Sequence, residues 1–305
     1  MRNYIVRRFL EMCAGLLVMS LLVFLLGRAL GDPVALLLSE FATESDRQVL
    51  IEELGLDRSL TVQYVSFLQH AVRGDLGNSV AGDRQPVMRL ILERLPASVM
   101  LAGLALLISL VIGIPLGVLA AVRYRSWLDY SVRAVALIGQ SVPVFWLGIV
   151  LIFLFSVQLG WLPTSGYGDL SHFVLPALTM SLFTVAAVAR LTRVGMIDAL
   201  DSEYVRLARM KGLKESRVIW KHALSNSLVP VLTYMGAFFA TMITGAVVIE
   251  TVFGWPGIGR LAYEAILERD FPLMQAVVLV MTALFMLANF TVDIIHAWLD
   301  PRVQP

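Results

Sequence analysis

The sequence has 305 residues, of which 58% are hydrophobic and only 15% are charged, and its formal net charge at pH 7 is +1. Soluble domains average about 45–50% apolar and about 25% charged residues, so this composition excludes a water-facing globule. The near-neutral charge gives no signal for nucleic acid, and a single cysteine, Cys13, excludes a disulfide framework. These values predict an integral membrane protein in a lipid bilayer.

Long runs without charged residues predict six membrane-spanning helices. A helix needs about 20 residues to cross the hydrocarbon core, and fewer where flanking side chains reach the interface. Three arginines precede the first apolar run, as in a signal peptide, but no small-residue cleavage site follows it, so we predict a retained anchor helix in residues 1–30. The expected spans are 9–29, 97–121, 133–157, 173–194, 229–252 and 273–297.

The positions of lysine and arginine in the short loops predict the orientation of these spans. Basic residues precede the first span and lie between spans 2 and 3 and between spans 4 and 5, whereas the loop between spans 3 and 4 has none. Both termini are therefore expected in the cytoplasm. The predicted units are the anchor helix, an extracytoplasmic cap at 31–95, a five-helix core at 96–297 with a cytoplasmic loop at 195–228, and a cytoplasmic tail at 298–305.

Short elements are also expected within the cap and within the spans. The periodicity of apolar residues predicts amphipathic helices over 45–54 and Leu60–Val72, and Gly74–Gly77 is typical of a turn. Gly113, Pro115, Gly117 and Pro143 interrupt spans 2 and 3. These breaks are either pointers to a substrate pathway or devices for close helix packing, and the sequence leaves both alternatives open.

No constellation of reactive side chains supports an enzyme. The four histidines lack the H-x-x-x-H spacing of metal ligands, and no P-loop sequence occurs. The segment Thr164–Tyr167, with Asp169 and His172 nearby, lacks G-x-S-x-G, so an interfacial turn is the preferred interpretation. Asp293 and His296 share one face of the last span and are either functional intramembrane groups or, as we prefer, interfacial side chains. We expect a non-catalytic chain that binds no metal and no cofactor.

The longest predicted cytoplasmic loop contains a well-marked short helix. Ser202 can cap a helix over residues 203–211, whose acidic start and basic end both suit the helix dipole. Gly212 is expected to end this helix in a left-handed conformation, with Leu213 packing back on Ala208. These features favour a rigid helix that is presented to another protein over a solvated basic loop.

The sequence of this helix resembles the coupling loop of permease subunits in the dipeptide/oligopeptide/nickel family of ABC importers. That loop commonly reads D/E-Y-V/I-R-x-A-R-A-K-G, and here Glu203–Gly212 reads E-Y-V-R-L-A-R-M-K-G. Met210 replaces the more frequent alanine but still suits a helix. The resemblance extends from Gly31 to Arg302 through shorter matches at Glu53–Asp57, Gly74–Gly77, Ala189–Arg193, His222–Asn226, Phe253–Arg260, Asp270–Pro272 and Asp300–Arg302.

The resemblance implies an all-α type I ABC importer permease with six transmembrane helices in the bacterial inner membrane. Its implied partners are a second, homologous permease subunit, two ATPase subunits that bind ATP and Mg, and an extracytoplasmic substrate-binding protein. Such a subunit converts closure of the ATPases into alternating access. Peptide is the expected substrate, and nickel or another small solute is the alternative. A secondary transporter is disfavoured, because it would need coupling-ion sites at mid-membrane and the span interiors are nearly free of ionisable groups.

Two sets of site residues follow from the resemblance. We expect the coupling set to contact an ATPase, with the small Ala208 and the terminal Gly212 against that subunit. We expect the outer set to brace the external mouth where the binding protein docks, with Trp255 as an interfacial anchor and Pro256–Gly257 as a type II turn whose glycine has a positive φ. The coupling set is Glu203, Tyr204, Arg206, Ala208, Arg209 and Gly212, and the outer set is Trp255, Pro256, Gly257, Gly259 and Arg260.

Overall fold

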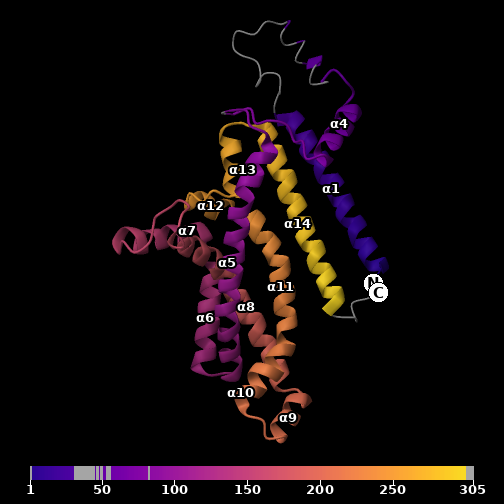
Figure 1. Ribbon diagram of the computed structural model, residues 1–305. Coiled ribbons are helices and arrows are strands. Elements are labelled where there is room, and N and C mark those ends of the chain that lie inside the picture. The colour runs from indigo at the N-terminus through magenta and orange to yellow at the C-terminus, as the bar shows by residue number, and fades with distance from the viewer. Residues whose placement is uncertain are drawn as a thin grey trace.

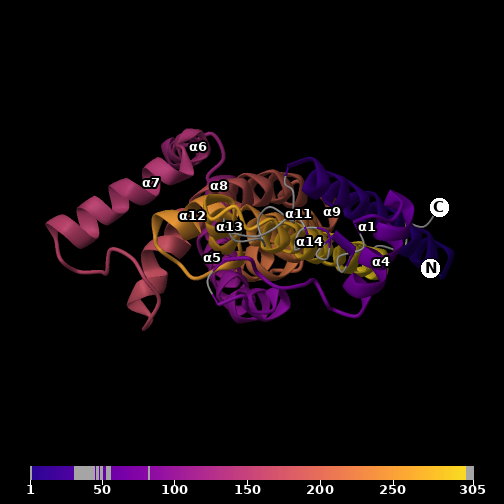
Figure 2. The same cartoon turned by 90° about the horizontal axis from the view of Figure 1, so that it is seen from above.

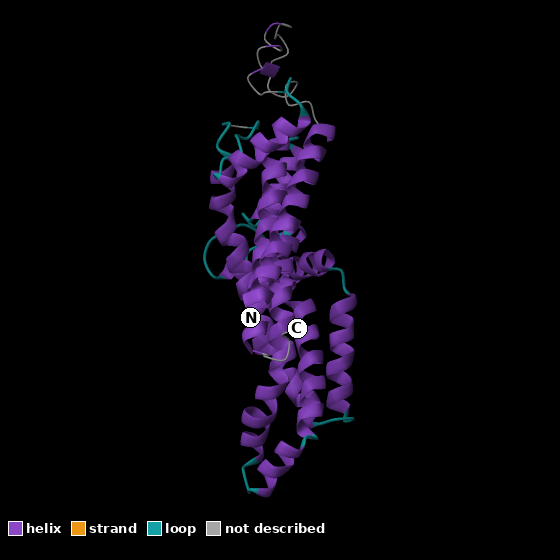
Figure 3. Ribbon diagram, turned by 90° about the vertical axis from the view of Figure 1, so that its right-hand side faces the viewer, coloured by secondary structure: helices purple, strands orange, loops and turns teal. Residues whose placement is uncertain are grey.

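The protein is a bundle of helices, elongated along the direction of its longest members (Figure 1). The computed structural model describes residues 2–30, 45, 48, 51–52, 56–81 and 83–299. Within those residues every regular element is helical, which confirms the all-α fold class. Most loops in this part of the chain are short, and the longer ones join α4 to α5 and η1 to α8 (Figure 3).

In the part of the chain that the structure describes, five stretches are helical, long and apolar enough to cross a membrane, and a bent pair of helices makes a sixth if it counts as one span. The pair consists of α6 followed by α7 and the π-helix η1, and the chain bends by 101° between its two arms. The long helices are α1 (Arg2–Leu30), α5 (Val87–Val122), α8 (Ser171–Leu200), α11 (Leu224–Gly245) and α14 (Phe271–Leu299), and the pair is α6 (Trp127–Ser141), α7 (Val144–Leu151) and η1 (Ile152–Gln158).

Two of the predicted spans are not continuous helices. In the third, Pro143 follows Val142, which is extended at φ −76° and ψ 126°, because a residue before proline disfavours the helical conformation. The arm formed by α7 and η1 therefore leaves the direction of α6 and projects sideways from the bundle (Figures 1 and 2). In the fifth, α11 ends at Gly245 and a separate short helix, α12 (Val247–Val252), follows it.

The centre of the bundle is the contact between α5 and α8, which is the most extensive in the described residues. Two glycines of α5 permit a close approach, because a Cβ on Gly113 would lie 2.7 Å from Cγ1 of Val188, and one on Gly117 would lie 2.6 Å from the carbonyl oxygen of Ala189. Of the two interpretations of these glycines, the structure supports helix packing. Pro115 lies inside the same helix.

The first and last long helices, α1 and α14, pack along each other at one side of this core (Figure 1). The Arg8 guanidinium lies 3.4 Å from the Asp293 carboxylate, with side-chain exposures of 41% and 28%. Asp293 is therefore an ion-pair partner that joins α14 to α1. This contact was not anticipated from the sequence, which placed Asp293 at a lipid interface without a partner.

Shorter helices lie at the two ends of the bundle. At one end are α4 (Leu60–Val72), as predicted, and α13 (Ile258–Leu267). The turn at Gly74–Gly77 is also present, with φ of 78° at Gly74 and 81° at Gly77. At the other end are α9 (Glu203–Met210), α10 (Glu215–Arg217) and the π-helix η2 (Val218–Ala223). The helix predicted over 45–54 and the match at Glu53–Asp57 lie mostly outside the described residues, and Asp300–Arg302 lies wholly outside them.

Candidate functional site

Helix α9 ends as the sequence predicts but begins differently. Gly212 has φ +74°, and its N–H donates to the carbonyl oxygen of Arg209 at 2.9 Å. The N–H of Leu213 donates to the carbonyl oxygen of Ala208 at 3.4 Å. This is the two-bond Schellman ending, which requires a left-handed residue. The expected side-chain cap at the start is wrong, because the hydroxyl of Ser202 donates to the carbonyl oxygen of Ala199 and accepts no N–H of α9.

Charged residues of the coupling set are paired within this chain. Arg206 donates to the Glu203 carboxylate at 2.9 Å, as expected for residues three apart, and to Asp201 at 3.0 Å. Arg209 donates to the Glu215 carboxylate at 2.7 Å, so it ties α9 to the start of the next helix. All these side chains are exposed, so each pair contributes little stability, but together they fix the orientation of α9.

The two sides of α9 have different surroundings. Val205 and Ala208 are 0% and 7% exposed and belong to a cluster with Val118 of α5 and Met196 of α8. The expectation that Ala208 lies against another subunit is therefore wrong, because its methyl group packs on its own chain. The opposite side exposes a stripe three positions apart in the sequence, with exposures of 40% at Tyr204, 51% at Leu207 and 75% at Met210.

The turn after α12, at the opposite end of the core, is buried rather than interfacial. Trp255 is 0% exposed, and its indole Nε1 donates to the carbonyl oxygen of Ala97 at 3.0 Å. Its ring meets Tyr167 and Phe173 edge to face, at centroid distances of 4.9 and 4.5 Å. The expectation of a Trp255 anchor at the lipid interface is wrong, because neighbouring helices satisfy both the ring and its N–H.

The positive φ in this turn lies at a different glycine from the one expected. Gly254 has φ +59°, whereas Gly257 has φ −103° and ψ 177°, which is ordinary extended backbone. Gly257 is needed for another reason, since a Cβ there would lie 2.2 Å from Cδ of Glu250. The type II turn centred on Pro256–Gly257 is therefore not formed, and the glycine instead leaves room for a carboxyl group.

Glu250 is the functional residue that the sequence interpretation missed. Its side chain is fully buried and accepts a hydrogen bond from the Ser98 hydroxyl at 2.6 Å and from the N–H of Arg260 at 2.9 Å. Ser98 in turn accepts the N–H of Ile258 at 2.8 Å. One carboxyl group thus holds α5, α12 and the start of α13 together. The sequence offered one signal for this role, because Glu250 is a lone acidic residue next to a glycine-rich turn.

Arg260 links both sides of the same turn. Its guanidinium donates to the carbonyl oxygen of Gly254 at 2.7 Å and to the Glu264 carboxylate at 2.7 Å. Pro256 is partly exposed and Gly259 is buried, with Val247 backbone atoms within 2.8 Å of any Cβ that would be added there. The outer set is therefore one packed unit, and most of its surface is covered by this chain.

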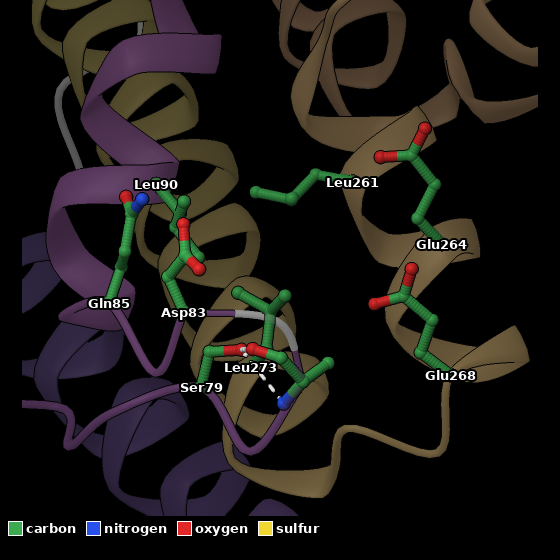
Figure 4. A pocket seen from close by; sticks show the side chains of 9 residues that line it. Ser79, Asp83, Gln85, Leu90, Leu261, Glu264, Glu268 and Leu273 are labelled. Atoms are coloured by element: carbon green, nitrogen blue, oxygen red, sulfur yellow. Dashed lines mark hydrogen bonds between the residues drawn. The ribbon is translucent and has the colours of Figure 1, made fainter.

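A cleft of about 530 Å³ opens beside this unit, between residues 79–85 and α13 (Figure 4). Glu264 and Glu268 lie on one side of it, and Asp83 and Gln85 lie on the other. The floor is fixed by Asp270, which is buried and accepts bonds from the Ser79 hydroxyl and from the N–H groups of Val80 and Leu273.

Asp169, just before α8, contacts the first two residues of that helix, Ser171 and His172. Oδ1 of Asp169 accepts hydrogen bonds from the hydroxyl and the N–H of Ser171 and lies 2.9 Å from Nδ1 of His172. These contacts, led by the Ser171 hydroxyl, lower the pKa of Asp169 to about 2. The segment Thr164–Tyr167 itself consists of bends and loop, which agrees with the preferred interpretation of a turn.

A buried ion pair joins α6 to α8. Asp129 is 0% exposed and binds the Arg193 guanidinium through both oxygens, at 2.6 and 2.9 Å. Arg193 belongs to the segment Ala189–Arg193 that carried part of the resemblance, whereas Asp129 was not singled out. A bidentate pair of this kind fixes the geometry of the two helices as well as their contact.

The fold and these sites define a multi-pass helical membrane component, with an apolar-faced helix exposed at one end and a braced turn at the other. Residues 113–305 match the model of the family "Binding-protein-dependent transport system inner membrane component", and residues 1–102 match that of its N-terminal region. The chain belongs to this family, which confirms the resemblance found in its sequence.

Curated relatives match along their whole length. The chain is 38% identical to the oligopeptide transport system permease protein AppB of Bacillus subtilis, over 100% of both chains. It is 38% identical to the glutathione transport system permease protein GsiC of Escherichia coli K12 and 42% identical to a putative peptide transport system permease protein of Brucella abortus, each over 100% of this chain and 99% of the relative.

A solved structure supports the fold. An inward-facing form of the MetNI methionine ABC transporter matches 70% of this chain and 97% of its own, with a TM-score of 0.60 and 18% identity. A second crystal form of that transporter matches with a TM-score of 0.61 and the same identity. This likeness establishes the permease fold of ABC importers for most of the chain.

Proposed function

We propose that this chain is the permease subunit of an ATP-driven importer of peptides. The observation that carries the proposal is the full-length identity of 38–42% to permeases whose names specify oligopeptides, glutathione and peptides. None of these names specifies nickel, so peptide is preferred over the metal as substrate. The chain would form half of a pathway with a homologous permease, and it would carry out no catalysis itself.

The membrane orientation and the remaining partners belong to the same proposal. The basic loops favour an orientation with α9 in the cytoplasm and with α13 and the acidic cleft outside, in a bacterial inner membrane. Two ATPase subunits, which would hold ATP and Mg, would then contact α9. A binding protein would deliver the peptide at the α13 end, where the unit around Glu250 and Trp255 would act as a rigid frame for the outer mouth.

The proposed contact with the ATPase is the exposed stripe of Tyr204, Leu207 and Met210. These side chains are 40–75% exposed on a helix outside the spans and have no partner within the described chain, and a protein groove would cover them. The paired charges of Arg206 and Arg209 lie beside the stripe and would border the contact. In this arrangement Ala208 supports α9 from behind and does not touch the partner, whereas Gly212 ends the helix and is exposed.

The test is Leu207→Asp in the reconstituted transporter with its ATPases and binding protein. We expect loss of stimulated ATP hydrolysis and of uptake, because burial of an unpaired carboxylate in an interface is costly. The matched control is Leu60→Asp on α4, since Leu60 is 57% exposed against 51% for Leu207. The coupling role of α9 would be refuted if Leu207→Asp transported at the unmodified rate.

A further inference from the structure

Arg190 is an exposed cation on a helix that is long and apolar enough to span the membrane. An arginine side chain within a span is costly in contact with lipid. It therefore faces a water-filled cavity or a partner subunit, or it extends to the membrane–water interface. The direction in which this guanidinium points decides among these three.

Hydrogen bonds to α6 give that direction. Arg193 binds Asp129 near the start of α6, whereas Nη1 of Arg190 donates to Oε1 of Gln140 near its end, at 3.3 Å. Asp129 and Gln140 are about 16 Å apart along α6, but the two arginines are only about 4.5 Å apart along α8, at 1.5 Å per residue. The two side chains therefore extend in opposite directions. Arg190 points toward the bend between α6 and α7 and away from the end that carries α9, so it does not reach for the nearer interface.

Most hydrogen-bonding capacity of Arg190 is unused. A guanidinium has five N–H donors, and Gln140 takes one of them. Among the residues that the structure describes, no carboxylate lies within 4.0 Å of Arg190, whereas Arg193 one turn away has both oxygens of Asp129. Free N–H groups in a planar fork match the two oxygens of a carboxylate.

Aromatic rings lie on the neighbouring part of this surface. Tyr234 and Phe238 of α11 stack at a centroid distance of 5.4 Å, and Phe238 stacks on Phe183 of α8 at 5.8 Å. Phe183 lies seven residues before Arg190 on α8, which is about two helical turns, so the two residues share one face of that helix. The guanidinium of Arg190 does not suit lipid. The exposed side of α1 does, because it carries leucines such as Leu17 and Leu25, which are 53% and 43% exposed.

We propose that Arg190 is a substrate-binding residue of the translocation pathway and that it takes a carboxylate of the passing peptide. Gln140 orients the guanidinium, and the stack of Tyr234, Phe238 and Phe183 forms an apolar wall beside it. The inference rests on the proposed function and narrows its substrate class to peptides with a free carboxylate. It also assigns the face shared by α8 and α11 to the pathway.

The experiment compares two probes, trialanine and its C-terminal amide, in proteoliposomes that hold the complete transporter. Uptake is expressed per ATP hydrolysed, at binding-protein concentrations where both probes are measured to be bound. We expect the unmodified transporter to favour the acid. Arg190→Gln should lower uptake of the acid about tenfold and leave the amide unchanged, because hydrogen bonds to charged groups are the strong ones. Arg190→Lys should fall between, since lysine keeps the charge but lacks the fork.

The control is Arg7→Gln, which removes a guanidinium with 75% side-chain exposure from α1 and should leave the preference unchanged. An equal effect of Arg190→Gln on both probes, or an effect on neither, overturns the assignment. Loss of the second permease from the purified complex would assign Arg190 to an ion pair with that subunit and would overturn it too. A failure of the proposed function is distinct, because the unmodified transporter would then take up neither probe with ATP.

Discussion

Gly257→Ala tests whether the turn after α12 is built around the carboxyl group of Glu250. On the present backbone, the added Cβ would lie 2.2 Å from Cδ and Oε1 of Glu250 and 2.4 Å from Oε2. The carboxyl group must move, but the Ser98 hydroxyl and the N–H of Arg260 hold its two oxygens. Overpacking costs about 1–3 kcal/mol. A buried hydrogen bond broken in the process costs about 1–3 kcal/mol more. We therefore expect a loss of roughly 2–6 kcal/mol in the free energy of unfolding.

Thermal unfolding of the purified transporter in detergent measures this loss. For chains of about 150–250 residues 1 kcal/mol shifts the melting temperature by about 2–4 °C, so a decrease of about 4 °C or more is expected. Fluorescence of the buried Trp255 gives a local signal. Gly103→Ala is the matched control, because a Cβ on Gly103 meets no atom within 4 Å and alanine favours the helix.

A second substitution separates the steric conflict from a general effect of alanine. Glu250→Asp shortens the side chain and withdraws the carboxyl group from position 257. The double variant should therefore lose less stability than the sum of the two single variants. An unchanged melting temperature for Gly257→Ala, or strict additivity in the double variant, would contradict the structural reasoning.

Two further predictions address the core and the topology. Arg193→Met should destabilise the transporter by about 1.5–3 kcal/mol in the same melting assay, because it removes both strong hydrogen bonds to the buried carboxylate of Asp129 and leaves Arg133, at 3.5 Å, as its ion-pair partner. An unchanged melting temperature would exclude a structural role for the pair. In a Cys13→Ser background, a cysteine at the exposed Ser59 should react with an impermeant thiol reagent in intact cells, whereas one at the exposed Ser216 should react only after the membrane is opened. Labelling of position 216 in intact cells would reverse the proposed orientation.

The number and approximate places of the apolar helices could be predicted, because lipid imposes a simple length rule on the sequence. The bends could not be placed, because a run of uncharged residues does not indicate where a helix changes direction. Pro143 marked a break within the third predicted span, but the angle of 101° depends on how α7 packs against α8 and α12. The end of α11 at Gly245 had even less signal, because both sides of the break are apolar.

Local rules gave the end of α9, whereas tertiary contacts decided which of its sides is buried. Gly212 requires only its own backbone conformation, so its role follows from the sequence. Ala208 is small and would fit against another subunit as well as against α5 and α8.

Trp255 raises the same ambiguity, because an aromatic residue beside a span can lie at the lipid interface or inside the protein. Trp255 was predicted at the lipid interface, but an acceptor for its N–H at Ala97 made burial possible. The sequence alone identifies neither the hydrogen-bond acceptor nor the packing neighbours of Trp255.

One pair of helices connects the two ends of the molecule on which the proposed function depends. Val205 and Ala208 of α9 pack on Val118 and Met196, near one end of α5 and α8, and Trp255 packs on Ala97 and Phe173, near the other. Between these contacts α5 spans about 30 Å at 1.5 Å per residue. Close-packed interiors deform little, and the glycines of α5 bring its backbone against α8. We therefore expect a displacement of α9 to move α5 and α8 together, and the turn held by Glu250 with them. In such an arrangement the braced turn transmits a movement generated at the other end of the bundle, and a loosened turn would absorb it.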